Sequence, residues 1–199
     1  MTTEKEYLTS ILGSDRTSSI FNYLSANNCV FSIVKPRKTK FGDFRQKGNS
    51  YKITVNQGLS KYRFVLTFIH ELAHLKTHIE YGRGAKPHGV EWKQNFRSLY
   101  KALDLKTFYS EDLKVLNAIE KEMINPKACG GVNYSLEEAL ISEPNDGTIG
   151  LKHVSANACF IFRKERYRKI NIRRTRALCL RVSNGKKYTI NLAARVHLC

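Results

Sequence analysis

The sequence predicts an α+β fold in two parts: helices packed on a short sheet, then a small basic antiparallel β domain. Three observations support this prediction. Apolar residues recur at helical spacing between residues 64 and 79, and again between 92 and 103. Short alternating runs precede the first of these helices, and four more lie in the last quarter of the chain. That quarter also holds most of the net positive charge.

Two helices and a small sheet are expected first. Residues 3–6 have the form of a capping box at the start of a helix, and an apolar stripe at residues 20–24 marks a second helix. We expect the sheet to contain three strands, at residues 30–34, 40–44 and 51–55.

The longest helix is predicted between Ser60, which can cap its start, and residues 82–87, whose two glycines and proline end it. Its apolar stripe consists of Phe64, Val65, Phe68, Leu72, Leu75 and Ile79. Further stripes at residues 92–103 and 113–123 predict two more helices, and residues 135–138 can start a short last one.

The long helix contains the motif His-Glu-Leu-Ala-His at residues 70–74. Positions i and i+4 share one helix face, so His70 and His74 can converge on one ion while Glu71 projects beside it. A catalytic zinc ion takes three protein ligands and a water, and a neighbouring carboxylate can take the proton of that water. The motif predicts a zinc-dependent hydrolase with Glu71 as general base. The alternative is a hydrogen-bonded helix without a metal.

The third ligand must come from elsewhere in the chain. His78 continues the i+4 series, but it lies about 12 Å along the helix axis from His70, too far to share an ion. His88 follows the loop that turns the chain back, and Glu91 lies one turn further on. We favour His88 over Glu91 because Gly89 permits a close backbone approach, although the residues alone leave both open.

Residues 68–74, followed by the run His-Gly-Val-Glu-Trp at 88–92, resemble the SprT-like metalloprotease domain, whose pattern is H-E-L-x-H and then H-G-x-x-W. The resemblance covers roughly residues 15–104, and only the two histidine motifs are specific. It implies a zincin-like metalloprotease domain that binds Zn²⁺ and cleaves a protein or peptide substrate. Members of this family include proteases that act on proteins attached to DNA. The implied zinc ligands are His70, His74 and His88, and the implied catalytic base is Glu71.

The cysteines depart from the family's frequent pattern, in which a four-cysteine zinc ribbon follows the protease domain. They stand at Cys29, Cys129, Cys159, Cys179 and Cys199, and no C-x-x-C pair occurs, so a ribbon is not expected. The odd count at wide spacings also does not suggest a disulfide framework. Residues 1–13 lack a signal-peptide core, and no apolar run is long enough to span a membrane. These observations predict a cytoplasmic protein without a membrane partner.

Charge divides the chain unevenly. The net charge is +17, and residues 151–199 contain thirteen Lys or Arg and one Glu. We therefore expect a metalloprotease domain at residues 1–142, a linker at 143–150 and a basic β-rich domain at 151–199, either a compact antiparallel sheet or a small barrel. Alternation around Asn184-Gly185 predicts a hairpin with a type I′ turn.

The densest basic run predicts contact with DNA or RNA phosphates. It consists of Arg163, Lys164, Arg166, Arg168, Lys169, Arg173, Arg174 and Arg176. The alternative is a solvated face that keeps a small sheet soluble. We favour nucleic-acid contact because solvated surfaces usually mix charges of both signs.

Two functions remain open from the sequence. The first is a zinc-dependent peptidase that acts on proteins associated with nucleic acid and is recruited through the basic domain. The second is a non-catalytic nucleic-acid-binding protein whose metal site is structural or vestigial. A protease assay with and without DNA, combined with metal analysis, separates them.

Overall fold

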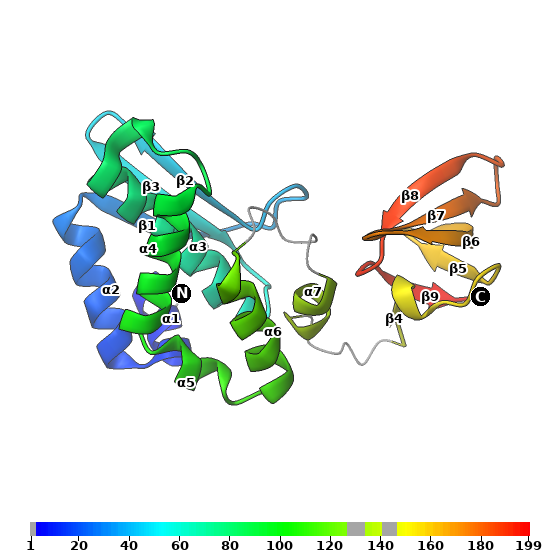
Figure 1. Ribbon diagram of the computed structural model, residues 1–199, viewed down its shortest axis with the longest axis horizontal. Helices are drawn as coiled ribbons and strands as arrows, with labels where there is room; N and C mark the ends of the chain where they lie inside the picture. Colours follow the sequence, from blue (N-terminus) through cyan, green and yellow to red (C-terminus); the bar gives the residue numbers. More distant parts are fainter. Residues whose placement is uncertain (1–2, 127–133, 141–146) are drawn as a thin grey trace. The chain divides into compact units, whose positions relative to one another are not determined.

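The computed structural model describes residues 3–126, 134–140 and 147–199 (Figure 1). The chain divides into two compact units, Met1–Ala128 and Cys129–Cys199. The α+β class is confirmed, because each unit contains helical segments and its own sheet. Half of the predicted linker at residues 143–150, namely residues 143–146, lies outside the described residues.

The sheet of the first unit has three strands, as predicted. They are β1 (Cys29–Val34), β2 (Gly42–Lys47) and β3 (Ser50–Asn56), in the order β1-β3-β2. β1 runs parallel to β3, and β2 runs antiparallel to it. Because β3 is central, β2 lies at an edge of this sheet.

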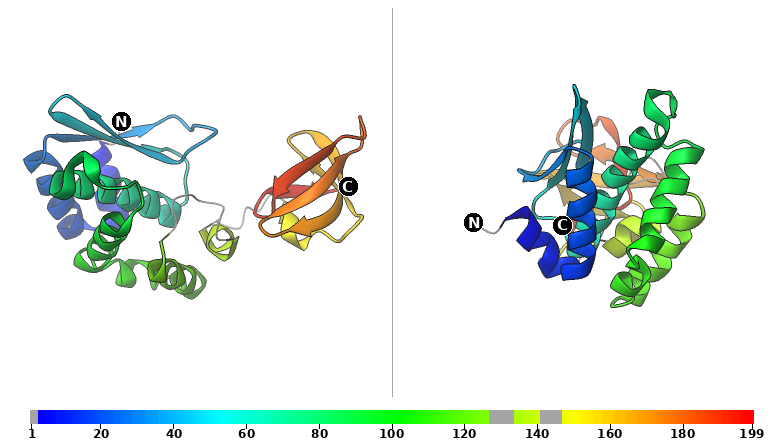
Figure 2. Two further views of the ribbon diagram at one scale, coloured as in Figure 1. Left: turned by 45° about the horizontal axis from the view of Figure 1, so that its top comes forward. Right: turned by 90° about the vertical axis from the view of Figure 1, so that its left-hand side faces the viewer.

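The helices of this unit lie on one side of the sheet (Figure 2, left). They are α1 (Glu4–Leu12), α2 (Ser14–Ala26), α3 (Lys61–Tyr81), α4 (Val90–Ala102), α5 (Leu105–Tyr109) and α6 (Leu113–Ile124). The predicted capping box at the start of α1 is present, and Ser60 caps α3. Within the described ranges, no helix combines the length and the apolar character needed to cross a membrane.

The core of this unit fixes the position of α3. Phe64, Phe68 and Leu72 are almost completely buried, as are Ile53 and Val55 of β3, against which α3 packs. Burying each such side chain contributes roughly 1.5–3 kcal/mol. The same helix also packs on α4. Packing against both the sheet and α4 fixes the position and rotation of α3, and therefore the direction in which its side chains project.

The second unit is an antiparallel sheet in the order β4-β9-β5-β6-β7-β8. Its elements are α7 (Tyr134–Leu140), β4 (Ile149–Gly150), the 3-10 turn η2 (Leu151–His153), β5 (Cys159–Phe162), β6 (Glu165–Arg173), β7 (Arg176–Arg181), β8 (Lys187–Asn191) and β9 (Arg195–Leu198). One cluster of buried side chains fills its inner face, including Phe160, Tyr167 and Val196.

Two of the hairpin turns in this sheet differ from the turn types that their sequences predict. The predicted β7–β8 hairpin is present, but its type I′ turn is wrong, because Gly185 has a positive φ of 66° and Asn184 does not. The two-residue turn between β5 and β6 instead consists of Arg163 and Lys164, with φ of 52° and 67°. Positive φ at both central residues is the requirement of a type I′ turn.

Lys169 departs from the predicted nucleic-acid contacts. Its side chain is on the inner face of β6 and only 3% exposed. Its amine donates hydrogen bonds to the carbonyl oxygens of Leu151, Lys152 and Val154 at 3.0, 3.1 and 2.5 Å. The predicted phosphate contact is not supported for this residue, because its charge is already used to hold η2 on the sheet.

Lys169→Met is expected to destabilise the second unit by about 2–4 kcal/mol, because three carbonyl groups lose a buried donor. The free energy of unfolding measured by urea titration tests this expectation. Lys164→Met is the matched control, since Lys164 is exposed in a turn. Equal stability of the two variants would contradict the structural role of Lys169.

Candidate metal centre

Two histidines of α3 and one histidine from the following loop meet at a single point. The Nε2 atom of His74 lies 3.3 Å from that of His70 and 2.9 Å from that of His88, and the remaining pair is 3.0 Å apart. His70 and His74 are one helical turn apart, so their rings project from the same face of α3. The structure therefore brings together the three histidines singled out in the sequence.

His88 reaches α3 from a tight loop. The chain leaves the helix through the 3-10 turn η1 (Gly82–Gly84) and places His88 at a φ of 59°, a left-handed conformation that is uncommon outside glycine. A Cβ added to Gly89 would lie only 2.9 Å from the carbonyl oxygen of Lys86. Glycine is thus required directly after His88, as the sequence suggested.

Trp92 packs against all three imidazoles. Its ring centroid lies 4.7 Å from those of His70 and His88 and 5.4 Å from that of His74. The indole is 1% exposed and stacks on Phe96 with centroids 5.1 Å apart. The first two turns of α4 therefore form an aromatic wall that restricts the orientation of the histidine rings.

The donor set suits a metal ion. A tetrahedral zinc ion with Zn–N bonds of about 2.1 Å holds its ligand nitrogens about 3.4 Å apart. The observed separations of 2.9–3.3 Å are close to that value. Within the described part of the chain, the metal-binding group consists of these three histidines, and Glu91 is not in it. Three imidazoles also leave one tetrahedral position to a further ligand.

Burial keeps the three imidazoles neutral. It is the main cause that lowers the pKa of His70 to about 3 and that of His74 to about 4, and the neighbouring histidines lower both further. Burial also lowers the pKa of His88. Because a metal ion binds neutral imidazole, these rings need not release protons to bind it at neutral pH.

Glu71 has a carboxyl group that titrates near neutrality. Burial is the main cause that raises its pKa to about 7, and the charge of Asp43 raises it further. Arg37, Lys40 and a hydrogen bond from the backbone of Phe44 act in the opposite direction. A carboxyl group with such a pKa can both accept and return a proton at physiological pH.

The edge strand β2 approaches Glu71 closely at Gly42. A Cβ added there would lie 2.6 Å from Oε1 of Glu71 and 2.7 Å from Cγ2 of Thr67. This contact does not follow from the sequence motifs. A signal was present, because a glycine inside a predicted strand often marks a close backbone approach.

The predicted nucleic-acid contacts lie on one strand and two turns of the second unit. Seven are exposed: Arg163 and Lys164 in the β5–β6 turn, Arg166 and Arg168 on β6, and Arg173, Arg174 and Arg176 around the β6–β7 turn. We call these seven residues the basic surface. Side-chain alternation places Arg166 and Arg168 on the face opposite to the buried Tyr167 and Lys169.

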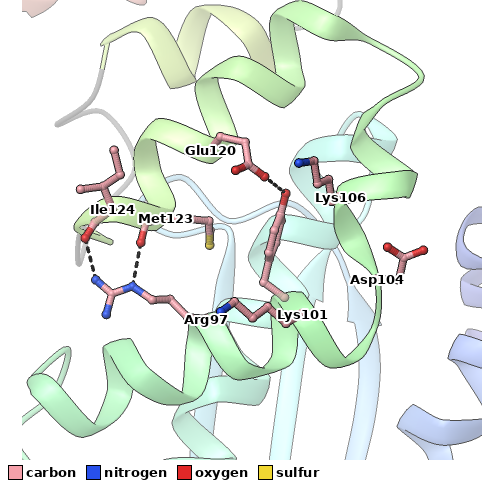
Figure 3. A pocket seen from close by; sticks show the side chains of 8 residues that line it. Arg97, Lys101, Asp104, Lys106, Glu120, Met123 and Ile124 are labelled. Atoms are coloured by element: carbon pink, nitrogen blue, oxygen red, sulfur yellow. Dashed lines mark hydrogen bonds between the residues drawn. The ribbon is translucent and has the colours of Figure 1, made fainter.

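A separate cavity of about 540 Å³ is lined by none of the three histidines (Figure 3). It is lined by Arg97, Tyr100, Lys101, Asp104, Lys106, Glu120, Met123 and Ile124. Arg97 donates hydrogen bonds to the carbonyl oxygens of Met123 and Ile124 at 2.7 and 2.6 Å, and Tyr100 donates one to Glu120 at 2.7 Å. These bonds tie α4 to the end of α6.

A helix with the H-E-x-x-H motif, a third histidine after a loop and a buried glutamate define a metalloprotease-like domain. Residues 15–112 match the model of the SprT-like family, so this segment of the chain is a SprT-like domain. The zinc metalloprotease assignment is a general property of the family. No curated protein and no solved structure matches the chain.

Proposed function

We propose that this protein is a zinc-dependent peptidase with a zincin-like first unit. The observation that carries the proposal is the convergence of three Nε2 atoms within 3.3 Å of one another, next to the buried carboxyl group of Glu71. His70, His74 and His88 would hold Zn²⁺. When bound, the ion would supply a Lewis acid for peptide hydrolysis.

Glu71 is the proposed general base. It follows His70 directly in α3, and its pKa of about 7 suits removal of a proton from the attacking water. The same group can then deliver that proton to the leaving amine of the peptide. The hydrogen bond from the backbone of Phe44 orients the carboxyl group from the side of β2.

The edge strand β2 is the proposed support for the substrate. Gly42 brings the start of this strand against Glu71, so a peptide paired with the outer edge of β2 would pass beside the metal centre. Backbone pairing of this kind holds an extended peptide with little dependence on its sequence. It requires a substrate segment that is unfolded or loosely folded.

We further propose that the basic surface recruits the peptidase to proteins associated with DNA or RNA. Its seven exposed residues stand on β6 and on the turns at both ends of that strand. Phe160 and Tyr167 are buried in the core, so phosphate contact rather than base stacking is expected to dominate. Binding should therefore depend strongly on salt and little on base sequence.

The test is a cleavage assay on a DNA-binding protein with a loosely folded tail, in the presence and absence of DNA. We expect zinc-dependent cleavage that DNA accelerates. The double variant Arg166→Glu and Arg168→Glu should lose this acceleration at physiological salt but keep cleavage of the free substrate. Nucleic-acid binding without any cleavage would instead favour a structural or vestigial metal site.

Gly42→Ala is expected to lower turnover by about 10- to 100-fold while zinc binding stays intact, because the added methyl group displaces the Glu71 carboxyl group. Initial rates and zinc content should be measured on the same samples. Gly84→Ala is the matched control, since a Cβ at Gly84 meets nothing within 4 Å. The interpretation fails if the two variants lose activity equally or if Gly42→Ala loses zinc.

A further inference from the structure

Two cysteines lie opposite each other on neighbouring strands of the second unit. The antiparallel register of β5 and β9 pairs Phe160 with Leu198 and Ile161 with His197. One step further along the same ladder, the backbone N–H of Cys199 donates a hydrogen bond to the carbonyl oxygen of Cys159, with N···O 3.4 Å. Cys159 and Cys199 are thus direct cross-strand partners.

The two thiols share one face of the sheet. Directly opposed residues of an antiparallel pair point to the same side, and side chains alternate along each strand. Phe160 and Val196 are buried on the inner face, so alternation places Cys159 and Cys199 on the outer face. Cys159 is half-buried and Cys199 is exposed, so reagents in solution can reach this position.

The backbone geometry suits a covalent link. Opposed residues that exchange backbone hydrogen bonds have Cα atoms about 5.5 Å apart. Disulfides span Cα separations of about 4.4–6.8 Å, with the commonest values near 5.5–6 Å. The backbone separation expected for this pair falls within that range, so a bond requires no change of strand register.

We propose that Cys159 and Cys199 form a reversible intrachain disulfide when the protein meets a peroxide. One thiolate attacks a peroxide oxygen, the O–O bond breaks, and a sulfenic acid and water result. The second thiol attacks the sulfenic sulfur, the S–S bond forms, the S–O bond breaks and a second water leaves. Two thiols lose two electrons and two protons in total, and one hydrogen peroxide is reduced to two waters.

The other described cysteines differ in their surroundings. Cys29 and Cys179 are buried, and burial raises the pKa of each thiol to about 11. Such thiols stay protonated and out of contact with solvent, so they react slowly with oxidants. Among the described cysteines, a peroxide is therefore expected to oxidise Cys159 and Cys199, because they are accessible to solvent and lie opposite each other.

The disulfide would lock β9 in the sheet. β9 lies between β4 and β5 in the strand order, so its pairing holds β4 to the rest of the unit. A bond between Cys159 and Cys199 would also place a reducible group beside Arg168, the residue opposite Cys159 on β6. Oxidation is therefore expected to stabilise the second unit and to change the surroundings of Arg168 in the basic surface.

The experiment uses the full chain, reduced, desalted and exposed to hydrogen peroxide at low protein concentration. The reaction is then stopped with an alkylating reagent. We expect a monomer about 2 Da lighter than the reduced protein before alkylation, two fewer alkylated cysteines, and a linked peptide pair joining Cys159 to Cys199. A reductant should reverse all three changes, and the midpoint of thermal unfolding should rise only in the oxidised sample.

Single variants identify the pair. Cys159→Ser and Cys199→Ser should each abolish the linked peptide and the shift in thermal midpoint, whereas Cys29→Ala should keep both. Pairing with Cys129, cross-linking between chains alone, or survival of the link in either serine variant would overturn the proposal. None of these measurements depends on zinc or on nucleic acid, so the outcome is independent of the proposed peptidase activity.

Discussion

Glu71→Gln is expected to reduce peptide cleavage by about 10²- to 10⁴-fold and to leave zinc binding unchanged. The amide has nearly the shape of the carboxyl group but cannot take a proton from water. The variant should therefore separate proton transfer from metal binding at the same position. Initial rates on an unfolded protein substrate, measured beside zinc content on one preparation, provide the comparison.

The stability of Glu71→Gln shows whether the substitution leaves the fold intact. The raised pKa of Glu71 means that burial disfavours its carboxylate, so its stabilising influence declines as the pH rises from about 4.5 through about 7. A neutral amide removes this unfavourable charge, and the unfolding midpoint at pH 8 should be equal to or above that of the original protein. The zinc-loaded original protein is the reference for activity, and the zinc-free original protein is the reference for stability. Retention of more than a tenth of the activity by Glu71→Gln would refute the general-base assignment.

His88→Ala is expected to weaken zinc binding by more than about 100-fold. Removing a partner that merely orients a ligand commonly costs 10- to 100-fold in metal affinity, and loss of a ligand itself should cost more. His70 and His74 would remain, but two imidazoles leave the ion without a third protein donor. Competition against a chromophoric chelator measures the affinity, and the zinc-dependent rise in thermal midpoint provides a second readout.

His78→Ala is the matched control for this experiment. His78 also belongs to α3, but its ring lies 6.1 Å from that of Phe44 and 5.4 Å from that of Tyr51, outside the histidine group. This variant should bind zinc like the original protein. Native affinity in His88→Ala would instead point to Glu91, the other third ligand considered from the sequence.

The convergence of the three histidines could be predicted from the sequence because the information for it is local. Helical spacing places His70 and His74 on the same face of one helix, and the glycines around His88 indicate a tight loop. The approach of Gly42 to Glu71 could not be located in this way. It depends on which strand lies at the sheet edge beside α3, and strand order is set by tertiary packing rather than by any local pattern.

In the second unit, the strands could be predicted from local patterns, but the turn types and the burial of Lys169 could not. Strand alternation correctly indicated the β7–β8 hairpin, yet the best turn signal, Asn184-Gly185, does not form the type I′ turn. Arg163 and Lys164 adopt positive φ instead, because Phe162 and Glu165 are paired directly across a two-residue turn. Lys169 was grouped with exposed cations because neighbouring charges in sequence alternate between the two faces of a strand.

The left-handed backbone at His88 has a consequence for how the three histidines would take up a metal ion. A φ of 59° at a side chain other than glycine is unfavourable by itself, and here it is maintained by the surrounding fold. The conformational entropy of arranging this donor is therefore lost during folding, before any ion arrives. Capture of the ion should then resemble occupation of a preorganised cage, with fast association and little rearrangement of the chain.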